Sequence, residues 1–208
     1  MNLRALLMQG LVDIDLPLDD TQIDRMLDYL ALLGKWNKSY NLTSITDPEK
    51  MIYYHLLDSL AIYNWVSHSR SALDVGSGAG LPGVPLAIAM PDCNWILLDS
   101  NGKKTRFMQQ ALAVCEIDNA VVVKSRVEDY HAAESFDIIV SRAFTSLTNF
   151  ADSVAHLCQA ETVMLAMKTG LGKEEAANLN TVKYSMQETE LRVTGIADKR
   201  SLVSLKLN

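Results

Sequence analysis

Several features that mark other protein classes are missing from this sequence of 208 residues. Its three cysteines, Cys93, Cys115 and Cys158, are far apart and match neither a metal-site spacing nor a disulfide framework. This usage is typical of a reducing compartment, and we expect all three to be small buried side chains. No apolar run reaches the roughly 18 residues that span a bilayer, and the first residues do not resemble a secretory signal. We therefore expect a cytoplasmic protein without a membrane segment.

The sequence also lacks a surplus of positive charge. Its net charge is −6 at pH 7 and its isoelectric point is about 5.2. Proteins that bind nucleic acid mainly through the phosphates usually have a basic surplus, so any such binding here would depend on local basic patches. The hydrophobic fraction of 49% and the charged fraction of 21% are those of a globular domain rather than a disordered chain.

Two helical segments are predicted in the N-terminal third. Over residues 18–36 and again over residues 46–66, apolar side chains recur at helical spacing. Both segments start with residues that favour a helix N-terminus: Asp19, Asp20 or Thr21 for the first, and Asp47 and Pro48 for the second. We expect residues 1–68 to form a helical cap that packs on residues 69–208 within one compact unit.

From residue 71 onwards, short apolar runs alternate with helical segments. The runs predict strands at residues 72–75, 94–99, 120–124, 136–141 and 162–168. Helices are predicted between them at residues 102–115 and 146–158, and this alternation is typical of a parallel sheet covered on both faces. Residues 183–193 and 201–208 predict an antiparallel hairpin at the sheet edge. The expected fold is α/β.

A glycine-rich stretch, "ALDVGSGAGLPG" at residues 72–83, follows the first predicted strand. A literal G-x-G-x-x-G is present at residues 78–83, but alone it is weak evidence for a dinucleotide site. In a dinucleotide fold the first glycine stands at the strand end, whereas here the turn begins two residues earlier, at Gly76. Asp74 would repel a pyrophosphate and would favour a positively charged ligand such as S-adenosylmethionine. Three glycines allow a sharp turn and close approach to such a ligand: Gly76, Gly78 and Gly80.

Residues after the next two predicted strands also suit a nucleoside. Asp99 comes about 20 residues after the glycine loop and can accept hydrogen bonds from both ribose hydroxyls, of NAD or of S-adenosylmethionine. In the loop at residues 124–130, Val127 can pack on an adenine face and Glu128 can meet its edge. For the glycine loop and Asp99, the alternative is a structural turn with a helix-capping aspartate. For residues 124–130, the alternative is a solvated charged loop.

Arg142 stands at the end of the fourth predicted strand. It can bind a base edge, a phosphate or the methionine carboxylate, or form a plain salt bridge. The Asp/Asn-Pro-Pro-aromatic pattern of enzymes that methylate base amines is absent from this position. A cysteine nucleophile for carbon-5 methylation is also absent from the predicted strand ends.

Candidate substrate contacts flank the same crevice. Their side chains can hydrogen-bond or stack on nucleotides, or attract phosphates: Asn41, Thr43, His55, Lys103, Lys104 and Arg126. His55 can instead fasten the cap to the sheet, and the lysines can be a solvated helix face.

Six segments in this order together resemble one family: "KWNKSYNLTS", "HLLDSL", "LDVGSGAGLPGVPLAI", "LLDSNGKKTRF", "SRVEDY" and "VSRAF". The chain resembles the bacterial 16S rRNA guanine-N7 methyltransferases, the glucose-inhibited division protein B family, from about residue 30 to the C-terminal hairpin. The resemblance implies a class I, Rossmann-like methyltransferase with a seven-stranded sheet. It implies methyl transfer from S-adenosylmethionine to N7 of a guanine in the decoding-region loop of 16S rRNA. By position it implies these cofactor contacts: Gly76, Leu81, Val127, Glu128 and Arg142.

The chain departs from the family pattern at two places. Asp99 stands where many relatives have glutamate, and "MKTG" at residues 167–170 replaces a Lys-Gly pair, which bears on Lys168 as a substrate contact. Methylation at N7 agrees with the absence of the amine-methylating pattern and of a cysteine nucleophile. Guanine N7 has a lone pair and no proton, so no general base is needed. Arg142 is the catalytic candidate, and no metal is expected.

The expected partner is 16S rRNA, free or within the small subunit or an assembly intermediate, and the chain is expected to be a monomer. Three alternatives stay open. They are a methyltransferase for a small molecule or protein, an NAD-dependent oxidoreductase, and an RNA-binding assembly factor without catalytic activity.

Overall fold

The computed structural model describes residues 2–142, 144 and 146–208. Its centre is a seven-stranded sheet in the order β3-β2-β1-β4-β5-β7-β6. The strands are β1 (Ser71–Val75), β2 (Asn94–Leu98), β3 (Ala120–Val123), β4 (Ile138–Ser141), β5 (Val163–Lys168), β6 (Tyr184–Leu191) and β7 (Arg200–Leu207). Strands β1 to β5 pair in parallel, whereas β7 runs antiparallel to both β5 and β6. The predicted parallel sheet and its C-terminal antiparallel hairpin are confirmed.

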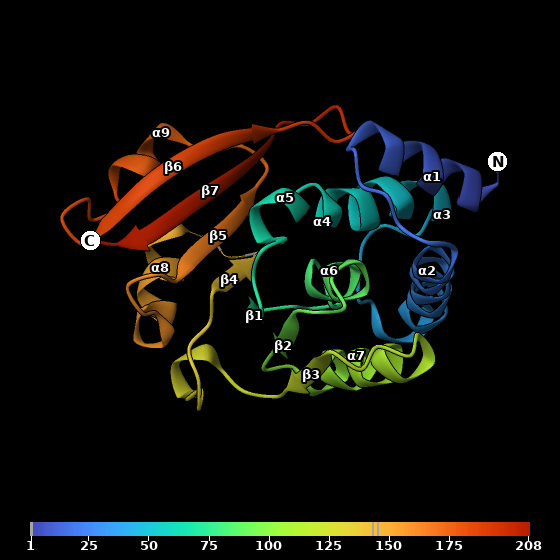
Figure 1. The fold of residues 1–208 in the computed structure, drawn as a ribbon, viewed down its shortest axis with the longest axis horizontal. Helices are drawn as coiled ribbons and strands as arrows, with labels where there is room; N and C mark the ends of the chain where they lie inside the picture. Colours follow the sequence, from blue (N-terminus) through green and yellow to red (C-terminus); the bar gives the residue numbers. More distant parts are fainter. Residues whose placement is uncertain (1, 143, 145) are drawn as a thin grey trace.

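Helices pack around this sheet, and most of them lie in the half of the molecule that contains the N-terminus (Figure 1). They are α1 (Leu3–Asp13), α2 (Asp20–Tyr40), α3 (Pro48–Met51), α4 (Asp58–Leu60), α5 (Tyr63–Val66), α6 (Gly83–Ala89), α7 (Gly102–Val114), α8 (Leu147–Val154) and α9 (Lys173–Ala177). The described chain also contains a π-helical turn, Ile52–Leu57, and 3₁₀ turns at Val127–Asp129 and Ala155–Leu157.

The two predicted helix starts agree with the structure. The Asp19 carboxylate accepts a hydrogen bond from the Gln22 N–H at 2.8 Å, and the Gln22 side chain accepts one from the Asp19 N–H at 3.0 Å. This reciprocal pair satisfies two backbone donors at the start of α2. In α3, Pro48 takes the first helical position and the Asp47 carboxylate accepts from the Lys50 N–H at 2.8 Å.

The helical region differs from the prediction in two respects. The helix predicted over residues 46–66 is divided, because α3 passes into the π-helical turn before α4 and α5. The sequence analysis also missed α1. That helix lies so close to the π-helical turn that a Cβ at Gly10 would come within 2.1 Å of a Leu57 methyl carbon. Its position therefore depends on tertiary packing, which local sequence signals do not reveal.

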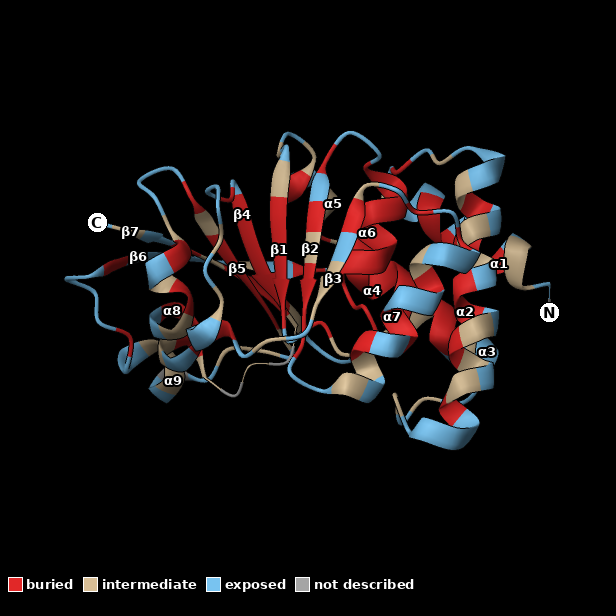
Figure 2. Cartoon of the chain, turned by 90° about the horizontal axis from the view of Figure 1, so that it is seen from below, coloured by how far each residue is buried: buried red, intermediate tan, exposed pale blue. Residues whose placement is uncertain are grey.

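Two hydrophobic clusters fill the two sides of the sheet. Because side chains alternate along a strand, Ala72 of β1 joins one cluster and Leu73 joins the other. The first cluster also includes Leu33 of α2 and Phe107 of α7, whereas the second includes Phe150 of α8. Strands β1, β2 and β4 are buried over most of their length (Figure 2). The N-terminal helices therefore share one core with the sheet, and the division at residues 68 and 69 stays a prediction.

Two of the three cysteines are buried as expected, and the third is only partly buried. Cys93 and Cys115 are buried free thiols and Cys158 is half-buried. Burial raises the pKa of these thiols to about 11, 12 and 11 respectively, so all three are protonated at neutral pH. Among the described residues, no helix is both long and apolar enough to cross a membrane.

Candidate functional site

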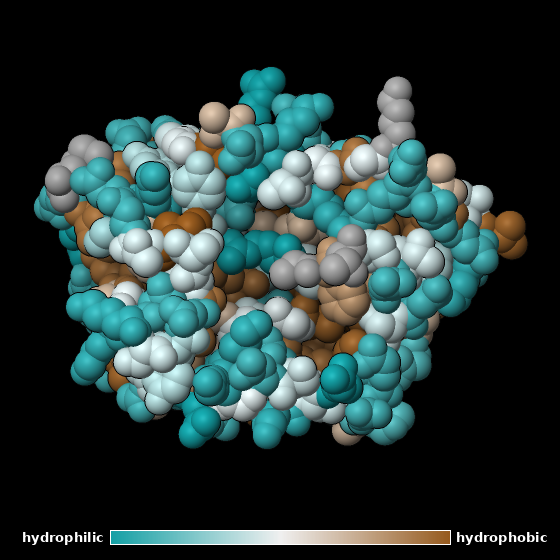
Figure 3. Space-filling view, turned by 180° about the vertical axis from the view of Figure 1, so that it is seen from behind, coloured by the Kyte–Doolittle hydropathy of each residue, from teal (hydrophilic) through white to brown (hydrophobic). Residues whose placement is uncertain are grey.

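The strand order reverses between β1 and β4, and two cavities open at the carboxyl ends of these strands. Ligands of open α/β sheets bind at such a switch point. The first, the Asp99 cavity, has a volume of about 340 Å³. The second, the Arg142 cavity, has a volume of about 510 Å³. Phe144 lines both, so the cavities adjoin. Figure 3 shows the molecule from this side, with its surface hollowed near the centre.

The glycine loop connects β1 to α6 in a left-handed backbone conformation. The φ angles are +68° at Gly76, +63° at Gly78 and +86° at Gly80, a region that glycine adopts without steric cost. At Gly80 a Cβ would also lie 2.5 Å from a Val84 methyl carbon. Gly76 lines the Asp99 cavity, and a Cβ there would meet no atom within 4 Å. The expected sharp turn beginning at Gly76 is confirmed.

Asp74 lies beneath the glycine loop, where it is completely buried. Its Oδ2 accepts hydrogen bonds from the Ser77 hydroxyl at 2.5 Å and from the Gly83 N–H at 2.9 Å. Burial raises the pKa of Asp74 to about 6, against the opposing effect of these hydrogen bonds. The side chain thus joins both ends of the loop and does not line either cavity.

Asp99 follows β2 directly and lines the cavity named after it. Its Oδ2 accepts a hydrogen bond from the Gly78 N–H at 2.9 Å, and its Oδ1 accepts from the Asn101 N–H at 2.8 Å. The Lys104 ammonium lies 3.7 Å from Oδ2. Each carboxylate oxygen can accept a further hydrogen bond, so the carboxylate is fixed in orientation and can still bind two hydroxyl groups.

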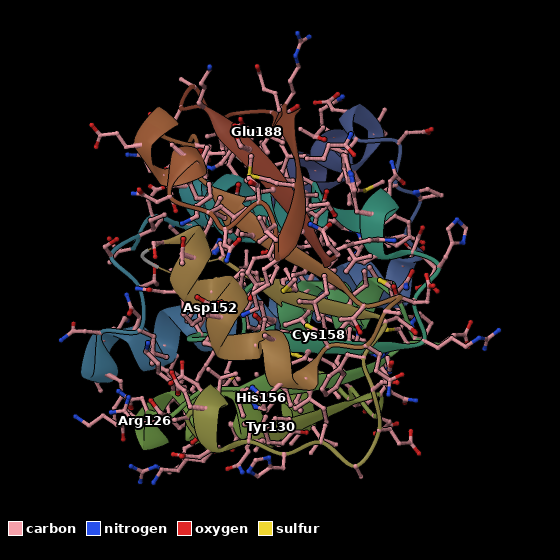
Figure 4. The ribbon with its side chains drawn as sticks, turned by 90° about the vertical axis from the view of Figure 1, so that its left-hand side faces the viewer. Arg126, Tyr130, Asp152, His156, Cys158 and Glu188 are labelled. Carbon is pink, nitrogen blue, oxygen red and sulfur yellow. The ribbon has the colours of Figure 1, made fainter. Side chains whose placement is uncertain are left out.

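The rest of the Asp99 cavity combines an apolar wall with charged groups. Val127, at the start of a 3₁₀ turn after β3, is buried, whereas Glu128 beside it is exposed. Arg126 lines the cavity and lies at the periphery of the molecule (Figure 4). An apolar wall beside an exposed carboxylate can receive a flat heterocycle with polar edges.

The Arg142 cavity contains two arginines that share one carboxylate. Nη1 of Arg142 lies 3.3 Å from Oδ2 of Asp58 and donates to the Tyr54 carbonyl at 2.9 Å. Nε of Arg200, on β7, donates to Oδ1 of the same aspartate at 2.9 Å. Asp58 is 5% exposed, and the Arg200 side chain is 11% exposed. Two guanidinium groups around one carboxylate leave this wall with a positive charge.

His55 and Thr43 form the wall beside these arginines. The Thr43 hydroxyl lies 3.0 Å from Nε2 of His55. Burial, with a further contribution from Arg142, lowers the pKa of His55 to about 4, so the imidazole is neutral at physiological pH. Because a neutral imidazole has one donor and one acceptor nitrogen, His55 can take part in hydrogen bonds of either sense.

Lys168 ends β5 on the opposite wall. Its ammonium lies 2.7 Å from the Glu175 carboxylate and donates to the Phe144 carbonyl at 2.9 Å. Glu175 in turn accepts a hydrogen bond from the Leu147 N–H at 2.9 Å, at the start of α8. The Lys168 charge is therefore already paired within the protein.

The structure brings most of the predicted site residues together. Those that line the Asp99 cavity are Gly76, Asp99, Lys104, Arg126, Val127 and Glu128. Those that line the Arg142 cavity are Thr43, His55, Arg142 and Lys168.

The other predicted site residues lie elsewhere. Leu81 is buried in the first hydrophobic cluster, and Lys103 is exposed on α7. Asn41 caps the C-terminus of α2 and lines a third cavity of about 410 Å³, which shares Thr43 and Ser44 with the Arg142 cavity. Gly78 and Gly80 shape the loop above the buried Asp74. The contacts of all these residues with a ligand stay predictions.

Sequence reasoning missed several residues that the fold brings to the site: Tyr29, Tyr54, Phe144, Glu175 and Arg200. No spacing within the sequence connects Arg200 with Asp58, because they lie on separate elements that meet only after folding. For Tyr29, nothing in the local sequence indicates that its hydroxyl has a polar partner on the glycine loop.

A larger cavity of about 880 Å³ lies at the other end of the strands. Its lining includes Arg70, Asp137, His156 and Cys158, and the last two are labelled in Figure 4. It adjoins the amino ends of β1 and β4, away from the switch point. In the described parts of the chain, no group of three or more His, Cys, Asp and Glu residues could hold a metal ion.

The same fold occurs in solved methyltransferases of low sequence identity. One is an O-methyltransferase of tomaymycin synthesis from Streptomyces achromogenes, solved in complex with SAM, with a TM-score of 0.63 and 11% identity. The alignment covers 100% of this chain and 99% of that chain. A precorrin-6y C5,15-methyltransferase from Geobacter metallireducens matches with a TM-score of 0.54 and 12% identity over 82% of this chain and 92% of that chain. These likenesses show that the chain has the class I methyltransferase fold, and the glycine loop and Asp99 follow its first two strands.

The family within this class follows from sequence. The family model described as rRNA small subunit methyltransferase G matches residues 22–203. A ribosomal RNA small subunit methyltransferase G from Nitrosococcus oceani is 44% identical over 201 residues, covering 97% of this chain and 94% of the relative. The protein of that name from Stutzerimonas stutzeri is 46% identical over 202 residues, which cover 96% of this chain and 94% of the relative. The chain belongs to this family, which confirms the resemblance found in its motifs.

Proposed function

We propose that this protein transfers a methyl group from S-adenosylmethionine to N7 of a guanine in the decoding-region loop of 16S rRNA. The observation that supports this most directly is the junction of the two cavities at Phe144. One cavity has the carboxylate and apolar wall that suit a nucleoside. The other has the cationic wall that suits a phosphorylated substrate. A methyl donor and a nucleotide base can meet where the cavities adjoin.

The residues of the Asp99 cavity fit S-adenosylmethionine. Asp99 would bind the ribose hydroxyls, and Val127 and Glu128 would contact the adenine face and edge. The open space around the Cβ position of Gly76 leaves room for a ligand against the backbone. Arg142 lies beyond Phe144 and would meet the methionine carboxylate or the RNA.

Catalysis of this reaction depends on alignment rather than on proton transfer. Bound S-adenosylmethionine supplies an electrophilic methyl group on its sulfonium. Guanine N7 has a lone pair and no proton, so the neutral His55 need not remove one. The arginines hold the nucleotide so that N7 is aligned with the methyl group, and orientation of this kind contributes several kcal/mol to catalysis, up to about 10.

The charge of the Arg142 cavity favours RNA over a neutral small molecule. Among the described residues, its charged lining consists of three cations and two anions: Arg142, Lys168, Arg200, Asp58 and Glu175. Because His55 is neutral, the wall has a net positive charge within a protein whose net charge is −6. A local cationic wall of this kind attracts phosphate. We place the reaction in the cytoplasm, on a monomeric enzyme.

The experiment supplies labelled S-adenosylmethionine to small ribosomal subunits and, in parallel, to free 16S rRNA, both from cells that lack this protein. The RNA is digested and the labelled nucleoside identified. Label in 7-methylguanosine is expected, and the tube in which it appears identifies the substrate form. Label in another nucleoside overturns the N7 assignment. Absence of label from both RNAs, with cofactor binding measured by calorimetry, overturns the RNA substrate and favours a small-molecule methyltransferase or an assembly factor.

A further inference from the structure

Helix α2 reaches the glycine loop through a buried hydrogen bond. The Tyr29 hydroxyl donates to the Ala79 carbonyl at 2.7 Å. Tyr29 is completely buried and Ala79 is 6% exposed, so water does not compete for this bond. Burial raises the pKa of Tyr29, which keeps the hydroxyl protonated as a donor. Ala79 lies between two glycines in the left-handed region. The Gly80 N–H next to it donates to the Ser77 carbonyl at 2.8 Å, and the Tyr29 hydroxyl adds a hydrogen bond from outside the loop.

The Tyr29–Ala79 hydrogen bond restrains the glycine loop next to Gly78, which binds Asp99 of the Asp99 cavity. The Gly78 N–H, one residue before Ala79, donates to the Asp99 carboxylate at 2.9 Å. A shift of the Ala79 carbonyl would therefore move the amide that orients Asp99. A second contact from the same helix, between the Gln22 amide and the Ile88 carbonyl at 2.9 Å, holds the end of α6.

The other end of α2 restrains a wall of the Arg142 cavity. The Asn37 amide donates to the Thr43 carbonyl at 2.9 Å and accepts from the Thr43 N–H at 2.9 Å. Asn37 is 7% exposed. Thr43 in turn contacts His55 at 3.0 Å. Asn37 thus closes the turn after α2 and sets the position of two cavity-lining side chains.

We propose that α2 is the positioning element of the site, in which Tyr29 orients Asp99 through the glycine loop and Asn37 orients Thr43 and His55. Neither Tyr29 nor Asn37 lines the cavity on which it acts, so both are positioning residues. The part that concerns Asn37 rests on the proposed RNA substrate. The part that concerns Tyr29 rests on cofactor binding alone.

Tyr29→Phe tests the cofactor end, because it removes one oxygen and leaves the Ala79 carbonyl buried without its donor. We expect the Kd for S-adenosylmethionine, measured by calorimetry without RNA, to rise about tenfold, which corresponds to about 1.4 kcal/mol. At saturating cofactor, kcat and the KM for RNA should change less than twofold. Tyr40→Phe is the matched control, since Tyr40 lies on the same helix but is partly exposed and stacks on Trp36.

Asn37→Ala tests the substrate end. We expect the KM for RNA to rise about tenfold, because both hydrogen bonds to Thr43 are lost. The Kd for S-adenosylmethionine should stay within twofold. Asn37→Asp, which keeps the acceptor for the Thr43 N–H, should raise this KM less than Asn37→Ala does. Asn64→Ala, at an exposed asparagine on α5, is the matched control.

Positioning is distinguished from a general loss of structure because each variant should change only one of two quantities, the Kd for S-adenosylmethionine or the KM for RNA. A wild-type Kd in Tyr29→Phe overturns the role of Tyr29. Variants that weaken cofactor and RNA binding equally overturn the proposal and show that α2 acts only through stability, which thermal unfolding of each variant measures. If the wild-type protein methylates no RNA, the role of Asn37 fails together with the proposed function. Calorimetry still decides the role of Tyr29 in that case.

Discussion

Asp58 shows how a single side chain organises charges that are far apart in the chain. Its two oxygens bind Arg142, after β4, and Arg200, at the start of β7. Without the carboxylate, two partly buried guanidinium groups would face each other with no anion between them. The aspartate therefore holds Arg142 in the cavity that adjoins the Asp99 cavity at Phe144, and it leaves one positive charge on this wall.

Arg142→Ala should reduce methyl transfer at least ~100-fold, the scale of losing one contact to the transition state. The hydrogen bond to the Tyr54 carbonyl is lost with it, so thermal unfolding should be recorded in parallel. The rate under single-turnover conditions is the measurement. Arg192→Ala, at an exposed arginine, is the control. Near-normal turnover in Arg142→Ala would make this residue part of the scaffold.

The raised pKa of Asp74 predicts that the stability of the protein depends on pH. Burial gives it a pKa of about 6, above the ordinary value of 3.8, so the folded protein binds this proton more tightly than the unfolded chain does. The resulting stabilisation is present at low pH and is lost as the pH rises through about 6. Relative to Asp74→Asn, which does not titrate, the wild type should lose up to about 3 kcal/mol between pH 4 and pH 7.

Urea unfolding of the two proteins across this pH range tests the prediction. The free-energy difference between them isolates Asp74, because every other titrating group is common to both. Parallel stability curves would mean that Asp74 has an ordinary pKa in the folded state.

At the scale of elements, the packing of α6 on the sheet requires a residue without a side chain at Gly83. A Cβ at Gly83 would lie 2.3 Å from a Leu97 methyl carbon and 2.7 Å from the Asp74 carboxylate. A side chain at this position fits only if the buried Leu97 and Asp74 side chains move. The start of α6 is thereby fixed against the strand that precedes the loop.

Gly83→Ala should lower the free energy of unfolding by about 1–3 kcal/mol, the usual cost of overpacking. Gly34→Ala should have the opposite sign, because Gly34 lies within α2 and a Cβ there meets no atom within 4 Å. Its expected gain is about 0.5–1 kcal/mol. Chemical denaturation of both variants provides the comparison, and equal effects would contradict the packing argument.

For the whole molecule, we predict that a local basic surface binds RNA although the net charge of the protein is −6. Lys104 is unsuitable for testing it, because its ammonium lies 3.7 Å from the Asp99 carboxylate and a reversed charge would disturb the cofactor cavity. Lys103 and Lys124 are exposed, and the Lys124 ammonium would lie 3.3 Å from a Cβ at Gly102. Lys103 is in the first turn of α7, and Lys124, in the loop after β3, lies beside that turn and the Asp99 cavity.

The double variant Lys103→Glu, Lys124→Glu should raise the KM for RNA by ~10-fold and reduce its salt dependence, while the Kd for S-adenosylmethionine stays unchanged. Arg70→Glu with Lys206→Glu makes the same change in net charge at the other end of the strands, where β1 begins and β7 ends. It should leave the KM nearly as in the wild type. Equal effects of the two pairs would mean that only net charge matters.

The shared hydrophobic cluster predicts that the chain unfolds as one unit. Residues 69–208 alone would expose the apolar faces of α6 and α7 that α2 covers. We expect this fragment to lack a cooperative thermal transition, whereas the whole chain shows a single one. A fragment that unfolds cooperatively would establish two independent domains with a boundary near residue 68.

The sequence by itself determined the strands, the hairpin, the glycine turn at Gly76 and the family. These follow from local signals, because apolar alternation, helix caps and glycine positions act over a few residues. Only the tertiary structure decided which side chains share a cavity. Asp58 with Arg200, and Tyr29 with Ala79, are contacts between elements distant in sequence, so no local pattern encodes them. Asp74 gives the clearest case: its ligand contact stays a prediction from sequence, whereas only the packing of α6 shows that it is buried and anchors the loop.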